Sequence, residues 1–147
     1  MQLSKLRDNR GFTLIEIMVV VVILGILAAI VVPRLLSRPD EAKVVKATVD
    51  MKSIEEALGL FKLDNGFYPS TDQGLKALVE KPETGRIPTK YSVDGYLKKK
   101  PVDPWGSDYV YLSPGLHSQQ FDLISYGADG QPGGEGFDAD INSWELD

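Results

Sequence analysis

Four carboxylates near the C-terminus could together bind a cation. Asp129, Glu135, Asp138 and Asp140 fall within one glycine-rich stretch of twelve residues. Their mutual repulsion opens such a loop unless a cation neutralises it. Carboxylates, supplemented by backbone carbonyls that glycine turns aim inward, suit Ca²⁺ better than Zn²⁺ or Mg²⁺. The spacing is not that of an EF-hand, and a solvated acidic turn explains the composition equally well.

Glu16 is a second carboxylate in an unusual place, because it is the only charged residue between Phe12 and Val32. A carboxylate at the centre of a bilayer costs about 2.5–3.5 kcal/mol. Either its side chain reaches the headgroups from one turn inside the boundary, or it meets a cation in an assembled state. Cleavage after Gly11 would create such a cation, the α-amino group of Phe12. A neighbouring subunit could then present that amine to Glu16.

The rest of the chain offers no recognisable catalytic group. His117 is the only histidine, and no nucleophile motif surrounds it. The 147 residues include no cysteine, which excludes disulfides and thiolate metal sites. The formal net charge of -5 and the lack of a basic stripe argue against nucleic acid as a partner. We therefore expect a protein that is not an enzyme and does not bind nucleic acid.

The apolar run from Phe12 to Val32 is long enough to span a bilayer as a helix. It is longer than the core of a typical secretory signal, and no pair of small residues follows it at the cleavage positions. We therefore expect it to be retained as a single membrane span. Basic residues flank both ends, so the positive-inside rule does not decide its orientation.

The elements that follow predict an α+β domain. Apolar residues at helical spacing predict an amphipathic helix that ends at Asn65-Gly66. Its apolar stripe consists of Val44, Ala47, Met51, Ile54, Leu58 and Phe61. If this helix continues the apolar run, residues 12–63 form one helix about 78 Å long. The stretches "DYVYL" and "FDLIS" predict two strands joined by the hairpin loop "SPGLHSQQ". A small antiparallel sheet would then pack on the amphipathic helix.

The N-terminus resembles the class III signal of type IV pilins and pseudopilins. Gly11-Phe12-Thr13-Leu14-Ile15-Glu16 follows a short basic leader and precedes the apolar run. The resemblance implies that a prepilin peptidase cuts between Gly11 and Phe12 and N-methylates Phe12, and that Glu16 acts in assembly. The resemblance also implies three segments: a leader at 1–11, a transmembrane and filament-core helix at 12–33, and a periplasmic pilin-like globular domain at 34–147. The helix at 12–33 would be able to unwind between Gly25 and Pro33.

The remainder resembles the major pseudopilin of type II secretion systems, in "YPSTDQGLKALVEKP", "GYLKKKPVDPWG" and "FDLISYGADG". The lack of cysteine favours this family over type IV pilins, whose C-terminal region a disulfide typically closes. The implied function is the major structural subunit of a periplasmic helical filament that drives export of folded proteins across the outer membrane. A type IV or competence pilus subunit is the alternative, and a monomeric calcium-binding receptor or chaperone tethered in the periplasm is a third possibility.

The resemblance also implies partners and a cofactor. The partners are other copies of the chain, the prepilin peptidase, minor pseudopilins, the inner-membrane assembly platform with its secretion ATPase, and membrane lipid. The implied location is the inner membrane, with a single span, before assembly into the periplasmic pseudopilus. The cofactor is one Ca²⁺, held by the side chains of Asp129, Asp138 and Asp140 and by the backbone of Tyr126 and Gln131.

Overall fold

The computed structural model describes residues 11–36 and 38–146, without the side chains of residues 31–36 and 38. The chain divides into two compact units, Met1–Arg38 and Pro39–Asp147. Of the predicted leader, only Gly11 lies within the described residues.

In the first unit, the described residues form helix α1, which spans Leu14–Leu36. Its backbone is helical throughout residues 25–33, and the unwinding expected in an assembled filament stays a prediction. The predicted membrane segment 12–33 ends in residues 31–33, whose side chains lie outside the described set. Within the described part of the chain, no helix is both long enough and apolar enough to cross a membrane.

Helix α2 spans Arg38–Asn65, and the second unit begins at its second residue, Pro39. Pro39 in the first turn and the acidic Asp40 and Glu41 are typical of a helix start. The helix ends at Gly66, whose φ of 81° lets its N–H bond the carbonyl of Lys62 at 2.7 Å. Residue 37 lies outside the described residues, so one continuous helix over 12–63 stays a prediction.

The apolar stripe predicted on α2 forms the centre of the core. Met51, Leu58 and Phe61 are fully buried, Ile54 is 2% exposed, and Ala47 is fully buried one turn earlier. Val44, at the start of the predicted stripe, is only partly buried. The helical spacing was therefore a sound guide to the buried face.

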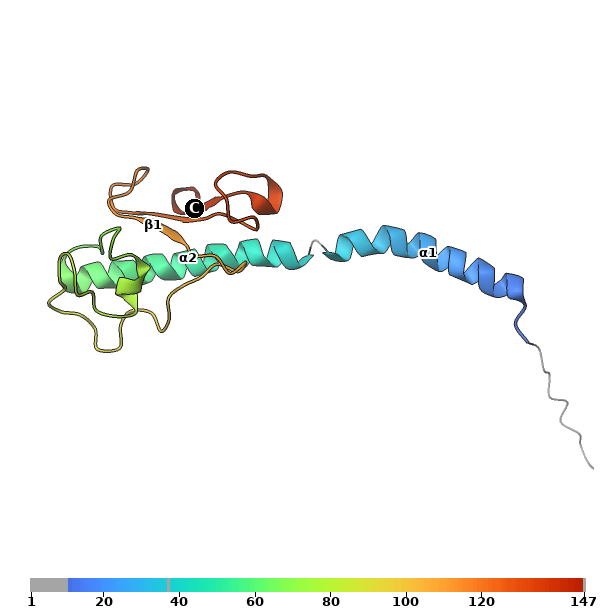
Figure 1. Ribbon diagram of the computed structural model, residues 1–147, viewed down its shortest axis with the longest axis horizontal. Coiled ribbons are helices and arrows are strands. Elements are labelled where there is room, and N and C mark those ends of the chain that lie inside the picture. The colour runs from blue at the N-terminus through green and yellow to red at the C-terminus, as the bar shows by residue number, and fades with distance from the viewer. Residues whose placement is uncertain (1–10, 37, 147) are drawn as a thin grey trace, which may run out of the picture. The chain divides into compact units, whose positions relative to one another are not determined.

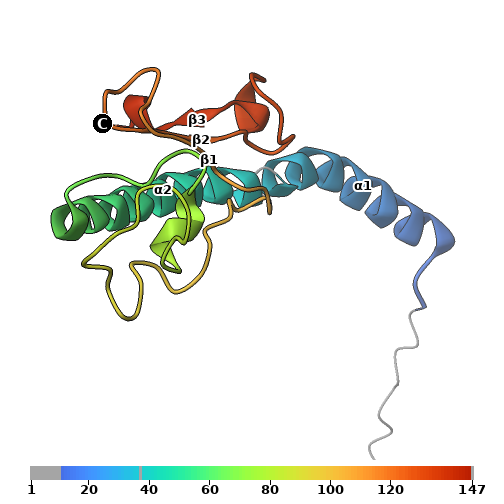
Figure 2. The ribbon, with the colours of Figure 1, turned by 60° about the vertical axis from the view of Figure 1, so that its left-hand side comes forward.

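A three-stranded antiparallel sheet lies alongside α2 (Figures 1 and 2). Its strands are β1 at Val110–Leu112, β2 at Asp122–Ser125 and β3 at Ile141–Asn142, in the order β1-β2-β3. Tyr111 pairs with Leu123 across the first two strands, and both side chains are buried. The α+β fold, with a small antiparallel sheet packed on a helix, is confirmed; β3 was not predicted.

Short 3₁₀ helices complete the unit, at Leu75–Leu78 (η1), Gly136–Asp138 (η2) and Ser143–Glu145 (η3). Leu75 and Leu78 of η1 belong to the core. The aromatic rings of Phe67 and Tyr96 pack against Phe61, with ring centroids 5.6 Å and 5.3 Å away. These contacts fix the loops after α2 to its C-terminal end.

Candidate functional site

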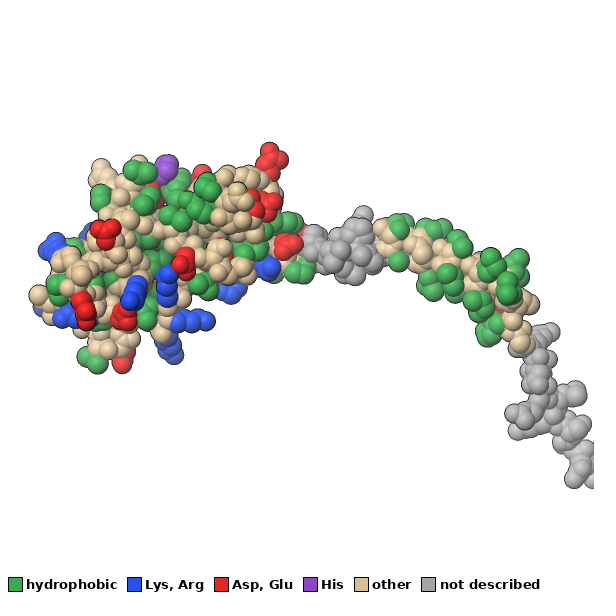
Figure 3. Space-filling model, viewed as in Figure 1, with side chains coloured by type: hydrophobic (Ala, Val, Ile, Leu, Met, Phe, Trp, Pro, Cys, Tyr) green, Lys and Arg blue, Asp and Glu red, His purple; other side chains and the backbone are tan. Residues whose placement is uncertain are grey.

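Helix α1 is apolar on every side, and its described side chains are uncovered within the described part of the chain. All described side chains from Gly11 to Ile30 are exposed, with Phe12 at 78% and Leu14 at 80%. Figure 3 shows hydrophobic side chains over the visible surface of this segment. A helix that is hydrophobic all round is normally buried, either in other protein or in lipid. This segment therefore requires an environment that one chain in water does not supply.

Thr13 and Glu16 interact at the first turn of α1. The Glu16 N–H donates to Thr13 Oγ1 at 3.2 Å, and the Thr13 N–H donates to Glu16 Oε2 at 3.4 Å. This reciprocal pair is a capping box, which satisfies two backbone groups that a helix start leaves free. The Thr-x-x-Glu spacing was visible in the sequence, so this role of Glu16 could have been predicted and was missed.

The capping box does not fully engage the Glu16 carboxylate. Its contact with the Thr13 N–H, at 3.4 Å, is longer than the usual N–H···O distance of about 2.9–3.0 Å. The carboxylate is exposed. Glu16 can therefore exchange this weak contact for a stronger one with a cation that approaches from outside the chain.

The acidic stretch predicted to bind calcium forms a closed loop after β2. The Ala128 N–H donates to the Phe137 carbonyl at 2.9 Å and joins the two ends. Gly127 has a φ of 61°, and a Cβ at this position would lie 2.8 Å from the carbonyl oxygens of Phe137 and Ala139. Only glycine fits this close approach.

The predicted ligands lie in this loop but do not converge. Asp129 Oδ1 accepts the Gln131 N–H at 3.0 Å, and Asp140 Oδ2 accepts the Gly133 N–H at 2.9 Å. Asp138 is exposed at the end of η2. Among the described residues, no three His, Cys, Asp or Glu side chains come together to hold a metal ion. Tyr126 directly follows β2, at the start of the loop.

The chemistry of the loop nonetheless fits a cation. Residues 126–140 contain four carboxylates and no lysine or arginine. Asp140 Oδ1 is buried and has no hydrogen-bond partner within the described structure. An unpaired buried carboxylate oxygen carries a desolvation cost that a cation would remove. The donors available are oxygen atoms, the ligands that Ca²⁺ prefers.

A second acidic site, which the sequence did not reveal, is built around Asp122 in β2. Its side chain is 1% exposed and accepts the N–H groups of Leu116, His117 and Ser118 at 2.7–2.9 Å. The Nδ1 atom of His117 lies 3.1 Å from Asp122 Oδ2, and its ring stacks on Trp144 with centroids 3.8 Å apart. Residues 116–118 lie four to six positions before Asp122, but no known sequence motif predicts these contacts.

The hydrogen bonds to Asp122 determine its charge. Burial alone would raise the pKa of this carboxyl, but the N–H groups of His117, Ser118 and Leu116 and the His117 ring outweigh burial and lower the pKa. Asp122 is therefore an ionised, hydrogen-bonded group that holds the loop between β1 and β2 against η3. The His117 ring is engaged in this structural contact.

Family models match almost the whole chain. Residues 34–144 match the model described as type II secretion system (T2SS), protein G. Residues 6–32 match the model described as the prokaryotic N-terminal methylation motif. The second match contains Gly11, Phe12 and Glu16, the residues on which the resemblance of the N-terminus was based.

Individual relatives agree with the family models. The chain is 61% identical to type II secretion system core protein G of Pseudomonas aeruginosa over 139 residues, covering 95% of this chain and 97% of that protein. It is 54% identical over 144 residues to the protein of the same name from Vibrio cholerae, covering 98% and 97%. The crystal structure of the major pseudopilin of enterohaemorrhagic Escherichia coli superposes with a TM-score of 0.68 at 42% identity, covering 77% of this chain and 92% of that one.

Proposed function

Because the chain belongs to the type II secretion system protein G family, we propose that it is the major pseudopilin of such a system. Its copies polymerise into a periplasmic helical filament that drives export of folded proteins across the outer membrane. The matched family favours this function over the alternative of a type IV or competence pilus. The chain has no catalytic role in this proposal.

The observation that carries the proposal is the exposure of α1. Its described side chains, up to Ile30, are exposed and almost all apolar. Such a surface is stable in lipid before assembly and among identical helices afterwards. A monomeric receptor or chaperone would need the segment only as an anchor and would use Glu16 only in its capping box with Thr13. A filament subunit uses both the apolar surface and the carboxylate.

Processing at Gly11 and Phe12 prepares the subunit for assembly. We expect a prepilin peptidase to remove residues 1–11 and to N-methylate Phe12, as the matched methylation motif supports. The exposed amine of Phe12 can then pair with Glu16 of a neighbouring copy. Because an unpaired charge in such an apolar environment is costly, this pair would fix the register of adjacent subunits.

The test is expression of the full chain in a bacterium together with a prepilin peptidase and the other components of the secretion machinery, followed by mass spectrometry of the N-terminus and electron microscopy. We expect a chain that begins at N-methylated Phe12 and forms filaments. A Gly11→Val variant is the matched control, and it should keep its leader and remain in the membrane without filaments. A correctly processed chain that forms no filaments with the complete secretion machinery present would contradict the proposal.

The location and partners follow from this function. The unassembled subunit would lie in the inner membrane with its single helix in lipid and residues 34–147 in the periplasm. The apolar α1 supports the contact with lipid. Assembly would further require minor pseudopilins, the inner-membrane platform and the secretion ATPase.

We also propose that the acidic loop binds one Ca²⁺ through Asp129, Asp138 and Asp140, with backbone oxygens of Tyr126 and Gln131. The unpaired Asp140 Oδ1 and the absence of basic residues between 126 and 140 support this site. A bound ion would neutralise the loop and add its binding free energy to folding.

The calcium proposal is tested by thermal unfolding of the full chain in detergent. We expect a chelator to lower the melting temperature, Ca²⁺ to restore it, and Asp138→Ala to abolish this response. Glu135→Ala is the matched control, since Glu135 lies in the same loop outside the proposed ligand set, and it should leave the response intact. A melting temperature that neither the chelator nor Asp138→Ala changes would contradict the proposed calcium site.

A further inference from the structure

One apolar side chain of the second unit projects fully into solvent from a turn that the fold holds in place. Val93 is 101% exposed. The turn around it closes through the Gly95 N–H, which donates to the Ser92 carbonyl at 3.1 Å. The following N–H of Tyr96 donates to the Leu78 carbonyl at 2.7 Å and attaches the turn to η1. Val93 and its exposed neighbour Asp94 therefore form a preorganised projection, which we call the Val93–Asp94 knob.

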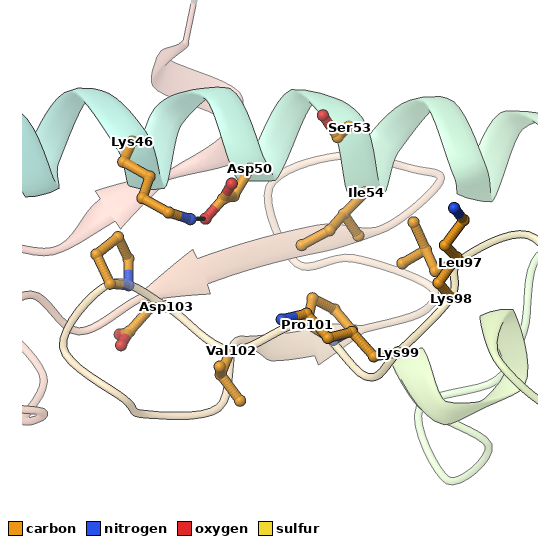
Figure 4. Close-up of a pocket in the computed structure, with 11 residues that line it drawn as sticks. Lys46, Asp50, Ser53, Ile54, Leu97, Lys98, Lys99, Pro101, Val102 and Asp103 are labelled. Carbon is orange, nitrogen blue, oxygen red and sulfur yellow. Dashed lines mark hydrogen bonds and ion pairs between the residues drawn. The ribbon is translucent and has the colours of Figure 1, made fainter.

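The same unit carries a groove of about 400 Å³ between α2 and the segment 97–104 (Figure 4). Ile54 lines it from the helix, and Leu97, Pro101, Val102 and Pro104 line it from the segment. The Val93–Asp94 knob does not occupy the groove of its own copy, because Val93 is fully exposed. The groove therefore presents an apolar surface without an apolar partner in the described chain.

The charges at the groove leave a positive rim. Asp50, at one end, is paired with Lys46. Asp103 is 3% exposed and is hydrogen bonded by the N–H groups of Trp105 and Ser107 and by the hydroxyl of Ser125. Both acids at the groove are thus already engaged within the chain.

Lys98 and Lys99 also line the groove and are exposed. Among the described residues neither makes an ion pair, whereas the next residue, Lys100, pairs with Asp108 at 2.6 Å. Figure 3 shows basic side chains gathered on this part of the second unit. The groove would therefore bind a segment in which an apolar side chain, for the lining, is followed by a carboxylate, for the two lysines.

We propose that the groove of one copy receives the Val93–Asp94 knob of the next copy in the filament, with Val93 against the apolar lining and Asp94 beside Lys98 and Lys99. This inference rests on the proposed function, since it needs copies to assemble. The knob and the groove are different surfaces, so the contact is heterologous. A heterologous contact propagates into an open helical polymer when its rotation does not close a ring. Two other apolar side chains of this unit are strongly exposed, Leu116 at 83% and Leu63 at 79%. Leu116 is followed by His117 and not by a carboxylate. Leu63 is followed by Asp64, whose carboxylate already accepts the Tyr96 hydroxyl at 2.9 Å.

Cysteine cross-linking tests the contact directly, because the chain contains no cysteine. Copies that carry Val93→Cys and copies that carry Val102→Cys are co-expressed, assembled and oxidised. We expect a disulfide-linked dimer that requires both variants. Leu116→Cys combined with Val102→Cys is the matched control and should give no product. Both altered positions in the knob and groove are exposed, so folding should be unaffected.

Charge reversal supplies a second measurement. Asp94→Lys in the Val93→Cys copy should reduce the cross-linked product about two- to fivefold, the range expected for an exposed ion pair. Lys98→Glu with Lys99→Glu in the Val102→Cys copy should restore it. Filaments that form normally without the 93–102 product, or that give equal product from position 116, would overturn this contact and leave the proposed function intact. Failure of the unaltered chain to form filaments would instead contradict the proposed function, and this inference with it.

Discussion

Replacing Asp122 with alanine should strongly destabilise the second unit. The carboxylate accepts three backbone N–H groups and the His117 ring, and it is 1% exposed. A hydrogen bond to a charged group contributes about 1.5–3 kcal/mol. The substitution also leaves three backbone N–H groups without their acceptor, and each one that stays buried costs about 1–3 kcal/mol. We expect Asp122→Ala to lower the free energy of unfolding by about 3–5 kcal/mol, a large part of the stability of an ordinary domain.

The assay is urea unfolding of the full chain in detergent, followed by tryptophan fluorescence. Asp108→Ala is the matched control, because Asp108 is an exposed partner of Lys100. Its loss should change the free energy of unfolding by less than about 1 kcal/mol. A loss below about 1 kcal/mol for Asp122→Ala would refute the assigned role of its hydrogen bonds.

The pH dependence gives this prediction a second, independent readout. Because the pKa of Asp122 is lower in the folded state than its ordinary value of 3.8, its stabilisation is present above that value and is lost as pH falls through the folded pKa. The difference in unfolding free energy between the unaltered chain and Asp122→Ala should therefore be constant near pH 7 and shrink below about pH 4. A difference that stays the same between pH 7 and pH 3 would contradict an ionised Asp122.

Three further predictions concern buried groups of the second unit. Tyr111→Phe should lower the free energy of unfolding by about 1 kcal/mol in a denaturant titration, because the Tyr111 hydroxyl donates to the Pro69 carbonyl at 2.9 Å. Tyr109→Phe should leave the free energy of unfolding unchanged or raise it, because the buried Tyr109 hydroxyl lacks a partner in the described structure. Equal losses from the two substitutions would contradict this distinction. Burial raises the pKa of Tyr111 to about 12 in the folded state, whereas the pKa in the unfolded chain is about 10. The stabilisation by the protonated Tyr111 is therefore complete below about pH 10 and falls by about 2–3 kcal/mol as the pH rises towards about 12. A free energy of unfolding that stays constant between about pH 10 and pH 12, with phenolate absorbance as the monitor, would disprove the shift. Gly127→Ala should destabilise the chain by about 1–3 kcal/mol and weaken its response to Ca²⁺. The added Cβ would lie against the Phe137 carbonyl, and the residue would have to keep a φ of 61°. An unchanged melting curve would exclude this strain.

Local periodicity explains what the sequence predicted well. The 3–4 residue spacing on α2 identified the buried side chains of Met51, Leu58 and Phe61, because such spacing places them on one face of a helix. The β-rich stretches identified β1 and β2 and the hairpin between them. Strand β3 was missed, since two residues, Ile141 and Asn142, are too few to show an alternating pattern.

The candidate sites depended on how individual loops fold, which the spacing of residue types does not show. The count of carboxylates indicated a cation site, but not that Asp140 would reach back to Gly133 while Asp129 bonds its own loop. The contact of Asp122 with residues 116–118 depends on how a loop folds over the end of a strand, which composition does not encode. Glu16 is the opposite case, because its partner Thr13 lies three residues away and the spacing alone was sufficient to predict the capping box.

The measurement that tests the central claim most directly is the filament yield of Glu16→Ala. The full chain, this variant and the matched Glu41→Ala variant are each expressed with the secretion machinery, and the membrane-inserted, processed and filamentous fractions are quantified. We expect Glu16→Ala to insert and to be cleaved after Gly11, with filaments absent or formed slowly, while Glu41→Ala assembles as the unaltered chain does. A normal yield of filaments from Glu16→Ala would contradict the claim that this carboxylate directs subunit assembly.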